Sequence, residues 1–530
     1  MKRYRLTKTT KILIFILILA ILGGGTFAAI KTGMVSLDKD EVGSSQNSGS
    51  TPTEVAVGND ENNAKKPSES SNEINISLDE WIGWKSIIDA NGGLETKPGS
   101  IYDKLGIKVN LHVINDATQS SNALIKGDLD AAGYTINRTA FLSKKFTDAG
   151  VDVVMPYITN YSNGGDGLIA TTAYQTVDSL INAKIGVPQF SEAHSLVVWF
   201  VNQSDLSEAD KNNIIKNLIY FETPDEVAKA FFAGQLDVAA TWQPYLTQAS
   251  TMTDCHVLFS TATSSKLIMD GILFRSDYAK NNPETVTKFI DGALQAAELY
   301  NTEFTAVREV MPMFNGMSDE DIKNSTEDAA LADWNNNIST LNNEAVAVFN
   351  DMCDVWESIG ETVNRNLSTK VFDASYMESL SDKYETLSTV STPKIAVTEE
   401  NRSEIINTEA LLTKSATVNF TINTAKFTDT AEASAALDDF IKIAKQLDGA
   451  IIQIEGNTDP NPNTDPTDEA NVLLSQQRAE TVKNYFVMNG IDPNRIITIG
   501  NGSSKPVVPN DSDEHRAANR RTDVSFKCIE

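Results

Sequence analysis

Two stretches of the chain, ALIKGDLDAAGYT (Ala123–Thr135) and AFFAGQLDVAATW (Ala230–Trp242), share one pattern at a separation of 107 residues. Each begins with the end of a helix and passes through a glycine, Gly127 or Gly234, that suits a helix C-cap. Each then continues, after an aspartate, into a short apolar strand. Helices and strands that alternate at such short intervals predict parallel α/β units. Two copies of the unit indicate two similar lobes. The alternative interpretation is that both stretches show only the turn signals common to any α/β fold.

Length and charge limit the classes of function. The chain has 530 residues, 41% of them hydrophobic, which is enough for the cores of roughly two to four domains. It carries 44 Lys and Arg residues against 72 Asp and Glu residues, a formal net charge of −28 at pH 7. Because nucleic-acid binding depends on neutralising phosphates with basic side chains, we expect no nucleic-acid partner.

Cysteine and histidine are rare. The three cysteines and four histidines do not show the paired spacing of a zinc site, and the cysteines are too few for a disulfide scaffold. We therefore expect no metal site and no cofactor. Whether Cys255 and Cys353 form a disulfide stays open at this point.

The N-terminal sequence predicts the cellular compartment of the protein. Residues 1–36 contain six basic and no acidic residues, and residues 12–30 are uncharged and mostly apolar. Nineteen helical residues nearly cross a hydrocarbon core of about 30 Å. With the basic flank inside, this segment predicts a transmembrane anchor in the cell membrane, an N-terminus in the cytoplasm and an extracytoplasmic body. A signal peptide cleaved after residues 26–28 is the alternative, and it would give a secreted or periplasmic protein.

Two polar stretches divide the rest of the chain. Residues 37–73 are rich in Ser, Asn, Gly, Asp and Glu, as in a disordered linker. A second polar stretch, residues 381–410, separates two regions of periodic hydrophobicity. We therefore expect a two-lobed domain over residues 74–380 and a compact C-terminal domain over residues 411–530.

The larger region resembles a known family in the order of its short motifs. These are GSIYDKLGIKVNLHVI, KGDLDAAGYT, GGDGLIA, KIGVPQFSEAHSLVVWF, TWQPY and MDGILFRSDYAKNNPETVTKFIDGALQA, followed by WESIGE and VFDASYMESL. In this order they are similar to the solute-binding proteins of ABC importers of the nitrate, sulfonate and taurine type. The resemblance implies a two-lobed, periplasmic-binding-protein-like α/β fold that closes on a small solute, with an ABC permease as the partner. It also implies that the chain enters the second lobe near residues 165–168 and returns near residues 270–272.

Matching the loops of that family gives a set of candidate solute-binding residues. They lie where strand ends and helix N-termini converge in an open α/β sheet. The set comprises Trp81, Trp84, Asp116, Tyr134, Thr135, Ser162, Asp166, Ser191, His194 and Trp242. Core packing of the tryptophans, turn capping by the aspartates and a hydrogen bond of His194 at its helix start are the alternatives. No arginine stands in these loops for an oxyanion, and Asp116 and Asp166 favour an amine or a hydroxylated ligand.

The C-terminal region changes to strand, helix, strand, helix, strand, strand. We expect the first strand at Val418–Ile422 and the first helix at Ala431–Leu447. The segment AIIQIEG predicts a buried strand, and LLSQQRAETVKNYFVMNG predicts a second helix that stops at Gly490. The segments RIITIGNG and RRTDVSFK then predict the last two strands of an α+β fold.

Four motifs in this region, IEGNTD, LSQQRAETV, NGIDPNRIITIGNGSSKP and NRRTDVSF, closely resemble the OmpA-like peptidoglycan-binding domain. The resemblance implies binding of diaminopimelate in the peptidoglycan stem peptide. This group carries an ammonium and a carboxylate, which an acid and a guanidinium can hold together. The acid of the family falls on Asp459 and its arginine on Arg478, while Asn471 would order the loop. The loop after Asp459 looks lengthened and carries three prolines and further acids.

Together these observations predict a binding protein and not an enzyme, since no nucleophile–base pair or phosphate loop stands out. The leading hypothesis is a membrane-tethered solute-binding protein that also attaches non-covalently to peptidoglycan and serves ABC-type import. The alternative is a structural protein of the cell envelope whose two-lobed domain binds a wall fragment or a protein partner.

Overall fold

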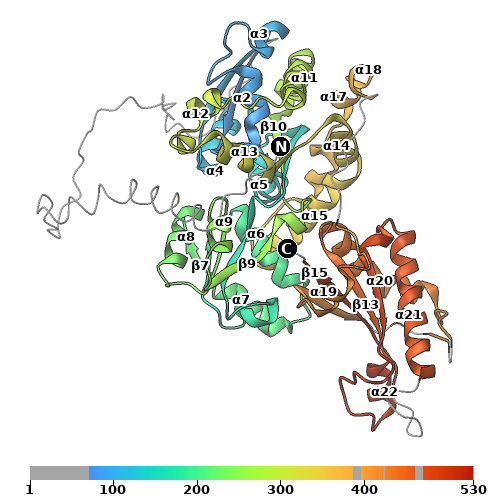
Figure 1. Cartoon of the computed structure of the whole chain (residues 1–530). Coiled ribbons are helices and arrows are strands. Elements are labelled where there is room, and N and C mark those ends of the chain that lie inside the picture. The colour runs from blue at the N-terminus through green and yellow to red at the C-terminus, as the bar shows by residue number, and fades with distance from the viewer. Residues whose placement is uncertain are drawn as a thin grey trace, which may run out of the picture.

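The structure of the protein is a computed structural model. It describes residues 71–385, 395–416, 418, 420–421, 424–459 and 469–528. The predicted anchor or signal peptide at residues 12–30 lies outside the described residues, as does nearly all of the predicted linker 37–73. Among the helices of the described residues, none has the length and apolar character needed to span a membrane. Figure 1 shows two lobes and, beside them, a smaller C-terminal body.

The first lobe is built on a six-stranded sheet with the order β11-β4-β10-β3-β1-β2. Strands β1, β2 and β3 run parallel, whereas β10 is antiparallel to both β3 and β4. The strands are β1 (Glu73–Leu78), β2 (Lys108–Val113), β3 (Ala131–Thr135), β4 (Val153–Ser162), β10 (Met269–Arg275) and β11 (Ala329–Leu331).

The second lobe is built on a five-stranded sheet with the order β7-β6-β8-β5-β9. Strands β6, β7 and β8 are parallel, and β5 is antiparallel to its neighbours β8 and β9. The strands are β5 (Asp166–Thr171), β6 (Ile185–Pro188), β7 (Ile219–Phe221), β8 (Val238–Trp242) and β9 (Cys255–Ser260). The parallel α/β units and the two lobes predicted from the sequence repeat are therefore confirmed.

The two repeated stretches occupy corresponding places in the two lobes. In the first, α4 (Ala117–Lys126) ends at Gly127, whose φ of 77° lies in the left-handed region, and leads into β3. In the second, α8 (Pro224–Phe232) is followed by Gly234, with φ of 73°, and leads into β8. Glycine is favoured at both positions because a side chain is strained at such φ values.

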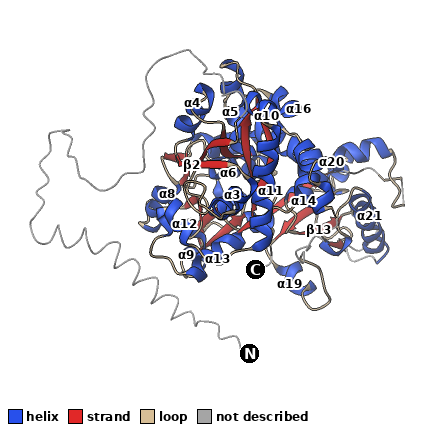
Figure 2. Cartoon of the chain, turned by 90° about the horizontal axis from the view of Figure 1, so that it is seen from above, coloured by secondary structure: helices blue, strands red, loops and turns tan. Residues whose placement is uncertain are grey.

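Between the sheets the chain crosses twice, from β4 to β5 through residues 163–165 and from β9 to β10 through residues 261–268. Helices flank the strands (Figure 2). Helix α15 (Ala345–Ser358) packs against α5 (Ile136–Asp148) of the first lobe and α6 (Glu192–Gln203) of the second.

The remaining helices of the two-lobed part belong to one lobe or the other. Those of the second lobe are α7 (Glu208–Lys216) and α9 (Tyr245–Ser250). Those of the first lobe and of the segment that closes it are α2 (Lys85–Asn91), α3 (Ile101–Leu105), α10 (Ser276–Asn281), α11 (Pro283–Leu299), α12 (Thr305–Val310), α13 (Asp319–Asp328), α14 (Trp334–Ser339), α16 (Ser368–Val371), α17 (Ser375–Glu378) and α18 (Ser381–Tyr384).

The C-terminal body has a mixed four-stranded sheet with the order β12-β15-β13-β14. Its strands are β12 (Leu412–Ala416), β13 (Ile451–Gly456), β14 (Ile496–Gly500) and β15 (Thr522–Lys527). Helix α21 packs against β13 and β14, and α20 packs against β12. The helices are α19 (Arg402–Asn407), α20 (Thr430–Gln446), α21 (Glu469–Met488) and α22 (Asp513–Asn519).

The first strand of this body among the described residues is β12, which was not predicted and pairs antiparallel with β15. Of the strand predicted at Val418–Ile422, residues 419 and 422 lie outside the described residues. Among the described residues of that predicted segment, Phe420 forms one isolated bridge with Phe427. The predicted helix at Ala431–Leu447 is confirmed as α20, with Leu437, Phe440, Ile441, Ala444 and Leu447 all buried.

The C-terminal body docks directly on the two-lobed part. The Gly449 amide donates to the carbonyl oxygen of Thr263 at 3.1 Å, and Asp448 accepts bonds from the amide and hydroxyl of Ser265. A β-carbon on Gly449 would lie 2.6 Å from the carbonyl oxygen of Ala262, so a side chain does not fit without a shift. Helix α20 adds contacts from Lys442 and Gln446 to Asp351 of α15.

The three cysteines are all free, with Cys255 and Cys353 buried. The disulfide that the sequence left open between these two residues is therefore not formed.

Candidate functional sites

Four carboxylates from four elements meet between the two lobes. Asp79 follows β1, Asp166 begins β5, Glu192 begins α6 and Asp270 lies on β10. Each is close enough to others of the group for their charges to raise a neighbour's pKa. The ends of strands from both lobes therefore bring negative charge to one place.

Arg138 of α5 joins the two lobes through one of these carboxylates. Its guanidinium donates to both oxygens of Glu192, at 2.9 Å from Nε and 2.7 Å from Nη2. The hydroxyl of Thr135 donates to the same carboxylate at 2.8 Å. Although burial raises the pKa of Glu192, Arg138 outweighs this and the net shift is downward. Glu192 is therefore ionised and fully engaged.

The other three carboxylates form no ion pair in the described part of the chain, although Asp79 lies near enough to Arg138 to interact with its charge. Burial, with the charges of Glu192 and Asp79 added, raises the pKa of Asp166 to about 7 against the opposing hydrogen bond from Ser162. Burial and the same two charges, together with that of Asp166, raise the pKa of Asp270 well above its usual range. Burial also raises the pKa of Asp79, which accepts a bond from the indole of Trp84 at 2.7 Å.

Trp81 lies across this group of acids. Its indole Nε1 donates to Oδ1 of Asn160 and to Oδ2 of Asp270, both at 3.1 Å. A β-carbon on Gly165, in the first crossover, would lie 2.5 Å from Cη2 of Trp81. The ring therefore needs glycine at that position in order to reach from the first lobe to the chain that enters the second.

Two hollows flank Trp81 and Asp79. The larger has a cavity volume of about 30 Å³, opens to solvent and is lined by residues of both lobes: Glu80, Trp81, Ile82, Trp242, Gln243, Pro244, Met313, Phe314, Met317, Ser325 and Asp328. The smaller, of about 10 Å³, is lined by Ser77, Leu78, Asp79, Ile114, Asn115, Ala117, Ser120, Gly133, Tyr134 and Arg138. The lining of the larger is mostly apolar or aromatic, but its volume is that of about one water molecule.

The structure brings together seven of the ten candidate solute-binding residues. Trp81 and Trp242 line the larger hollow and Tyr134 the smaller, while Trp84, Thr135, Ser162 and Asp166 belong to the hydrogen-bonded surroundings of the carboxylates. Tyr134 shares a hydrogen bond of 2.7 Å with Ser120.

The other three have structural partners. Asp116 caps α4, and Ser191 caps α6. His194 is fully buried, and its Nδ1 accepts the amide of Phe190. Burial lowers the pKa of His194 to about 4, so the ring is neutral at pH 7.

Sequence reasoning missed Asp79, Arg138, Glu192 and Asp270 as members of the cleft. Two of them had a local signal, because Asp79 lies two residues before Trp81 and Glu192 directly follows Ser191. Within the described residues, no group of three or more His, Cys, Asp or Glu side chains has the geometry to hold a metal ion.

The second candidate site lies in the C-terminal body, around Arg478 of α21. This side chain is 8% exposed, and its Nε donates to the carbonyl oxygen of Thr424 at 3.2 Å. Its guanidinium lies 4.9 Å from the ring centre of Phe420, in a cation–π contact. No described residue forms an ion pair with Arg478 or accepts a hydrogen bond from its Nη atoms. The two Nη atoms of this arginine therefore have no protein acceptor in the described part of the chain.

Asp459 lies close to Arg478 and is held by another arginine. Nη1 of Arg520 is 3.2 Å from Oδ2 of Asp459, in a partly exposed ion pair. Burial and the charge of Arg520 lower the pKa of Arg478, while the charge of Asp459 opposes this shift. The charges of Asp459 and Arg478, the two residues predicted from the sequence, therefore interact with each other, and Arg520 interacts with both.

Asn471, the third predicted residue, lies in the first turn of α21. A β-carbon on Gly502 would lie 3.6 Å from the carbonyl carbon of Asn471, so this turn lies against the loop after β14. Residues 460–468, most of the loop that looked lengthened in the sequence, lie outside the described residues.

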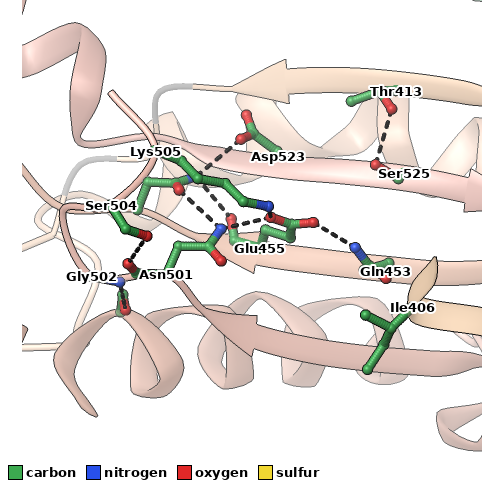
Figure 3. A network of polar contacts seen from close by, with 12 residues as sticks. Ile406, Thr413, Gln453, Glu455, Asn501, Gly502, Ser504, Lys505, Asp523 and Ser525 are labelled. Carbon is green, nitrogen blue, oxygen red and sulfur yellow. Dashed lines mark hydrogen bonds and ion pairs between the residues drawn. The ribbon is translucent and has the colours of Figure 1, made fainter. Parts of the chain in front are cut away.

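A polar network fixes the strand that leads to Asp459 (Figure 3). Glu455 of β13 accepts bonds from Lys505 and Asn501 at 2.6 Å and from Gln453 at 2.5 Å. Although burial raises the pKa of Glu455, these donors outweigh it and lower the pKa overall. Asn457 donates to Asp523 at 3.0 Å. The position of Asp459 is thus set by satisfied hydrogen bonds on the preceding residues.

The comparisons with known proteins agree with the OmpA-like resemblance of the C-terminal body. The model of the OmpA family matches residues 419–520. The C-terminal body is an OmpA-like domain. Two curated relatives match the same region, the outer membrane protein A of Bordetella avium at 40% identity and the peptidoglycan-associated lipoprotein of Pseudomonas putida at 33% identity. Each match covers 18% of this chain, and 47% and 53% of the respective relatives. The chain thus spans about half the length of these curated relatives.

One solved structure similar to the two-lobed part is the periplasmic aliphatic sulphonate binding protein of Escherichia coli. It is 16% identical, with a TM-score of 0.44, and the match covers 57% of this chain and 98% of that protein.

Proposed function

We propose that the OmpA-like domain binds peptidoglycan through Asp459 and Arg478. The observation that carries the proposal is the guanidinium of Arg478, which is nearly buried beside Asp459 without an acceptor for its Nη atoms among the described residues. A buried charged group of this kind is costly unless a ligand pairs with it. The match to the OmpA family and to a relative named for its association with peptidoglycan support the same function.

Diaminopimelate fits the charges of this site. Its carboxylate pairs with the Nη atoms of Arg478, which suit a two-pronged contact. Its ammonium pairs with Asp459, whose partly exposed contact with Arg520 is weak enough to rearrange. Asn471 and the first turn of α21 lie at the anionic end, where backbone amides favour a negative charge. Binding is non-covalent, and the chain performs no chemical conversion.

The two-lobed domain, in this proposal, binds a small solute and serves ABC-type import with a permease. Support comes from the larger hollow, which is lined by residues of both lobes, and from the pair of Arg138 and Glu192, which bridges the lobes beside the two described crossovers. Loss of the ligand would allow the lobes to separate about the crossovers, as expected of two domains that close on a solute.

The proposed organisation places the body outside the cytoplasm, in the cell envelope. Residues 1–36 anchor the protein in the membrane, residues 37–73 act as a tether, and residues 381–410 link the domain 74–380 to the domain 411–530. Attachment to both the membrane and the wall would keep the solute-binding domain close to a permease.

A sedimentation assay tests the wall-binding function. Purified full-length protein should sediment with insoluble peptidoglycan of the diaminopimelate type, and free diaminopimelate should compete. The double variant Asp459→Ala, Arg478→Ala should remain in the supernatant. A matched control is the double variant Asp513→Ala, Arg516→Ala, which removes an exposed acid–arginine pair on α22 of the same domain. Equal sedimentation of both double variants would refute the site.

A further inference from the structure

The cleft between the lobes contains more negative than positive charge in its described residues. Arg138 is bound by both oxygens of Glu192. The remaining carboxylates, those of Asp79, Asp166 and Asp270, each accept a side-chain hydrogen bond from a neutral donor: the indole of Trp84, the hydroxyl of Ser162 and the indole of Trp81, respectively. Asp166 and Asp270 are therefore held only by neutral donors among the described residues, whereas Asp79 also interacts with the charge of Arg138.

Two of these acids are nearly buried and still have an unused oxygen. Asp166 is 6% exposed and Asp270 is 4% exposed. In both, Oδ2 accepts the side-chain hydrogen bond, while Oδ1 has no donor in the part of the chain that the structure describes. Neither Oδ1 atom is sealed in the interior. Because burying a carboxylate without a partner is costly, these two oxygens indicate that a donor is supplied from outside the chain.

Aromatic rings border the same place. The ring of Trp81, whose Nε1 donates to Asp270, also forms one wall of the larger hollow. Trp242 and Phe314 form further walls, and the carboxylates of Glu80 and Asp328 also line it. The faces of aromatic rings attract cations, most strongly those of tryptophan. The aromatic walls of the hollow and the carboxylates thus both favour a positively charged ligand.

We propose that the cleft binds a small organic cation, an amine or a quaternary ammonium compound. Its charged nitrogen lies among Asp79, Asp166 and Asp270, and its apolar part lies against Trp81 and Trp242. An anionic solute such as a sulfonate would need a free arginine or lysine, and Arg138 is already held by Glu192. This inference rests on the proposed solute-binding function and adds the charge of the solute.

Thermal unfolding and calorimetry of the purified full-length protein test it with probes of matched size. The probes are choline, its uncharged analogue 3,3-dimethylbutan-1-ol, putrescine, ethanesulfonate and Mg²⁺. Choline or putrescine should raise the Tm and bind at least about tenfold more tightly than the uncharged analogue and ethanesulfonate. The variants Asp166→Asn and Asp270→Asn should lose this binding, whereas Asp148→Asn, at an exposed carboxylate of α5, should retain it.

The stability of each variant, measured without ligand, distinguishes a variant that has lost only the binding site from one whose fold is damaged. Asparagine keeps an acceptor for Ser162 or Trp81 and removes an uncompensated charge, so both variants should unfold at the same or a higher temperature than the wild type at about pH 8. If ethanesulfonate or the uncharged analogue binds while neither amine does, the charge assignment is wrong and the solute-binding function stands. Binding of Mg²⁺ alone also overturns the assignment. If no probe binds and both variants are less stable than the wild type, the assignment and the solute-binding function fail together.

Discussion

The cleft and the site in the OmpA-like domain both combine carboxylates with arginine, but in opposite proportions. In the cleft, the described residues include four carboxylates and one arginine, Arg138, which donates to both oxygens of Glu192. In the OmpA-like domain, Arg478 and Arg520 surround the single acid Asp459. The difference shows how the partner of an arginine decides its role. Arg138 is part of the framework that joins two lobes, whereas Arg478 is available to a ligand.

Removal of Arg138 should have the largest effect on stability. The pair with Glu192 is largely buried, with side chains 18% and 17% exposed. Arg138→Met leaves Glu192 without its cation, which should lower the free energy of unfolding by about 3–5 kcal/mol. Tryptophan fluorescence during urea unfolding measures this change, because all six tryptophans lie between residues 81 and 356, in the two-lobed part.

Arg365→Met provides the control for Arg138→Met. Arg365 pairs with Asp354 and Glu357 on the surface and is 39% exposed. Its replacement should cost no more than about 1 kcal/mol. Equal losses for the two variants would mean that Arg138 does not hold the lobes together.

Arg478→Met should show the reverse pattern, with a large effect on binding and a small one on stability. Loss of a charged two-pronged contact should weaken binding to diaminopimelate-type peptidoglycan by about 10- to 100-fold. The stability of the OmpA-like domain should change little, because methionine replaces the packing on Phe420 and no ion pair with a described residue is lost. Sedimentation at graded peptidoglycan concentrations measures the affinity, and circular dichroism measures the stability. A loss of stability equal to that of Arg138→Met would contradict the distinction.

The last prediction concerns the pH dependence of stability. The pKa of Asp166 is raised to about 7 in the folded protein, so the folded state holds a proton that the unfolded state releases near pH 4. Without a ligand, stability should therefore fall as the pH rises from about 4 to about 7. Asp166→Asn should reduce this fall. Asp79 and Asp270, whose pKa values burial also raises, would account for the rest, whereas Glu192, whose pKa is lowered beside Arg138, acts in the opposite direction. Thermal unfolding across this range measures it, and an unchanged profile would contradict the buried, uncompensated state of Asp166.

The parts of the fold that were predicted from the sequence depend on local signals. Gly127 and Gly234 end helices in both lobes because their backbone conformation disfavours side chains, and this is readable from neighbouring residues. The strand β12 was missed because it is an edge strand with the polar sequence LTKSA, which lacks a clear apolar alternation.

The acid and the arginine of the OmpA-like domain could be predicted because they belong to motifs with fixed spacing. The cleft was only partly predictable. Trp81 and Asp166 lie at strand ends, which local patterns locate. The pair of Arg138 and Glu192 joins residues 54 positions apart, and Asp270 returns from the second lobe, so no local pattern connects them. Long-range closure of the two lobes decides which charges meet.

The turn at Thr261–Thr263 touches both halves of the molecule. The hydroxyl of Thr261 shares a hydrogen bond with Ser162, accepts from the amides of Gly164 and Asp166, and lies 3.2 Å from the carbonyl oxygen of Asp166. Two residues later, the carbonyl oxygen of Thr263 accepts the amide of Gly449 from the OmpA-like domain. If the OmpA-like domain is attached to a wall, as proposed, tension on that domain would reach the backbone of Asp166 through this turn, alongside the contacts of Asp448 with Ser265 and of Lys442 with Asp351.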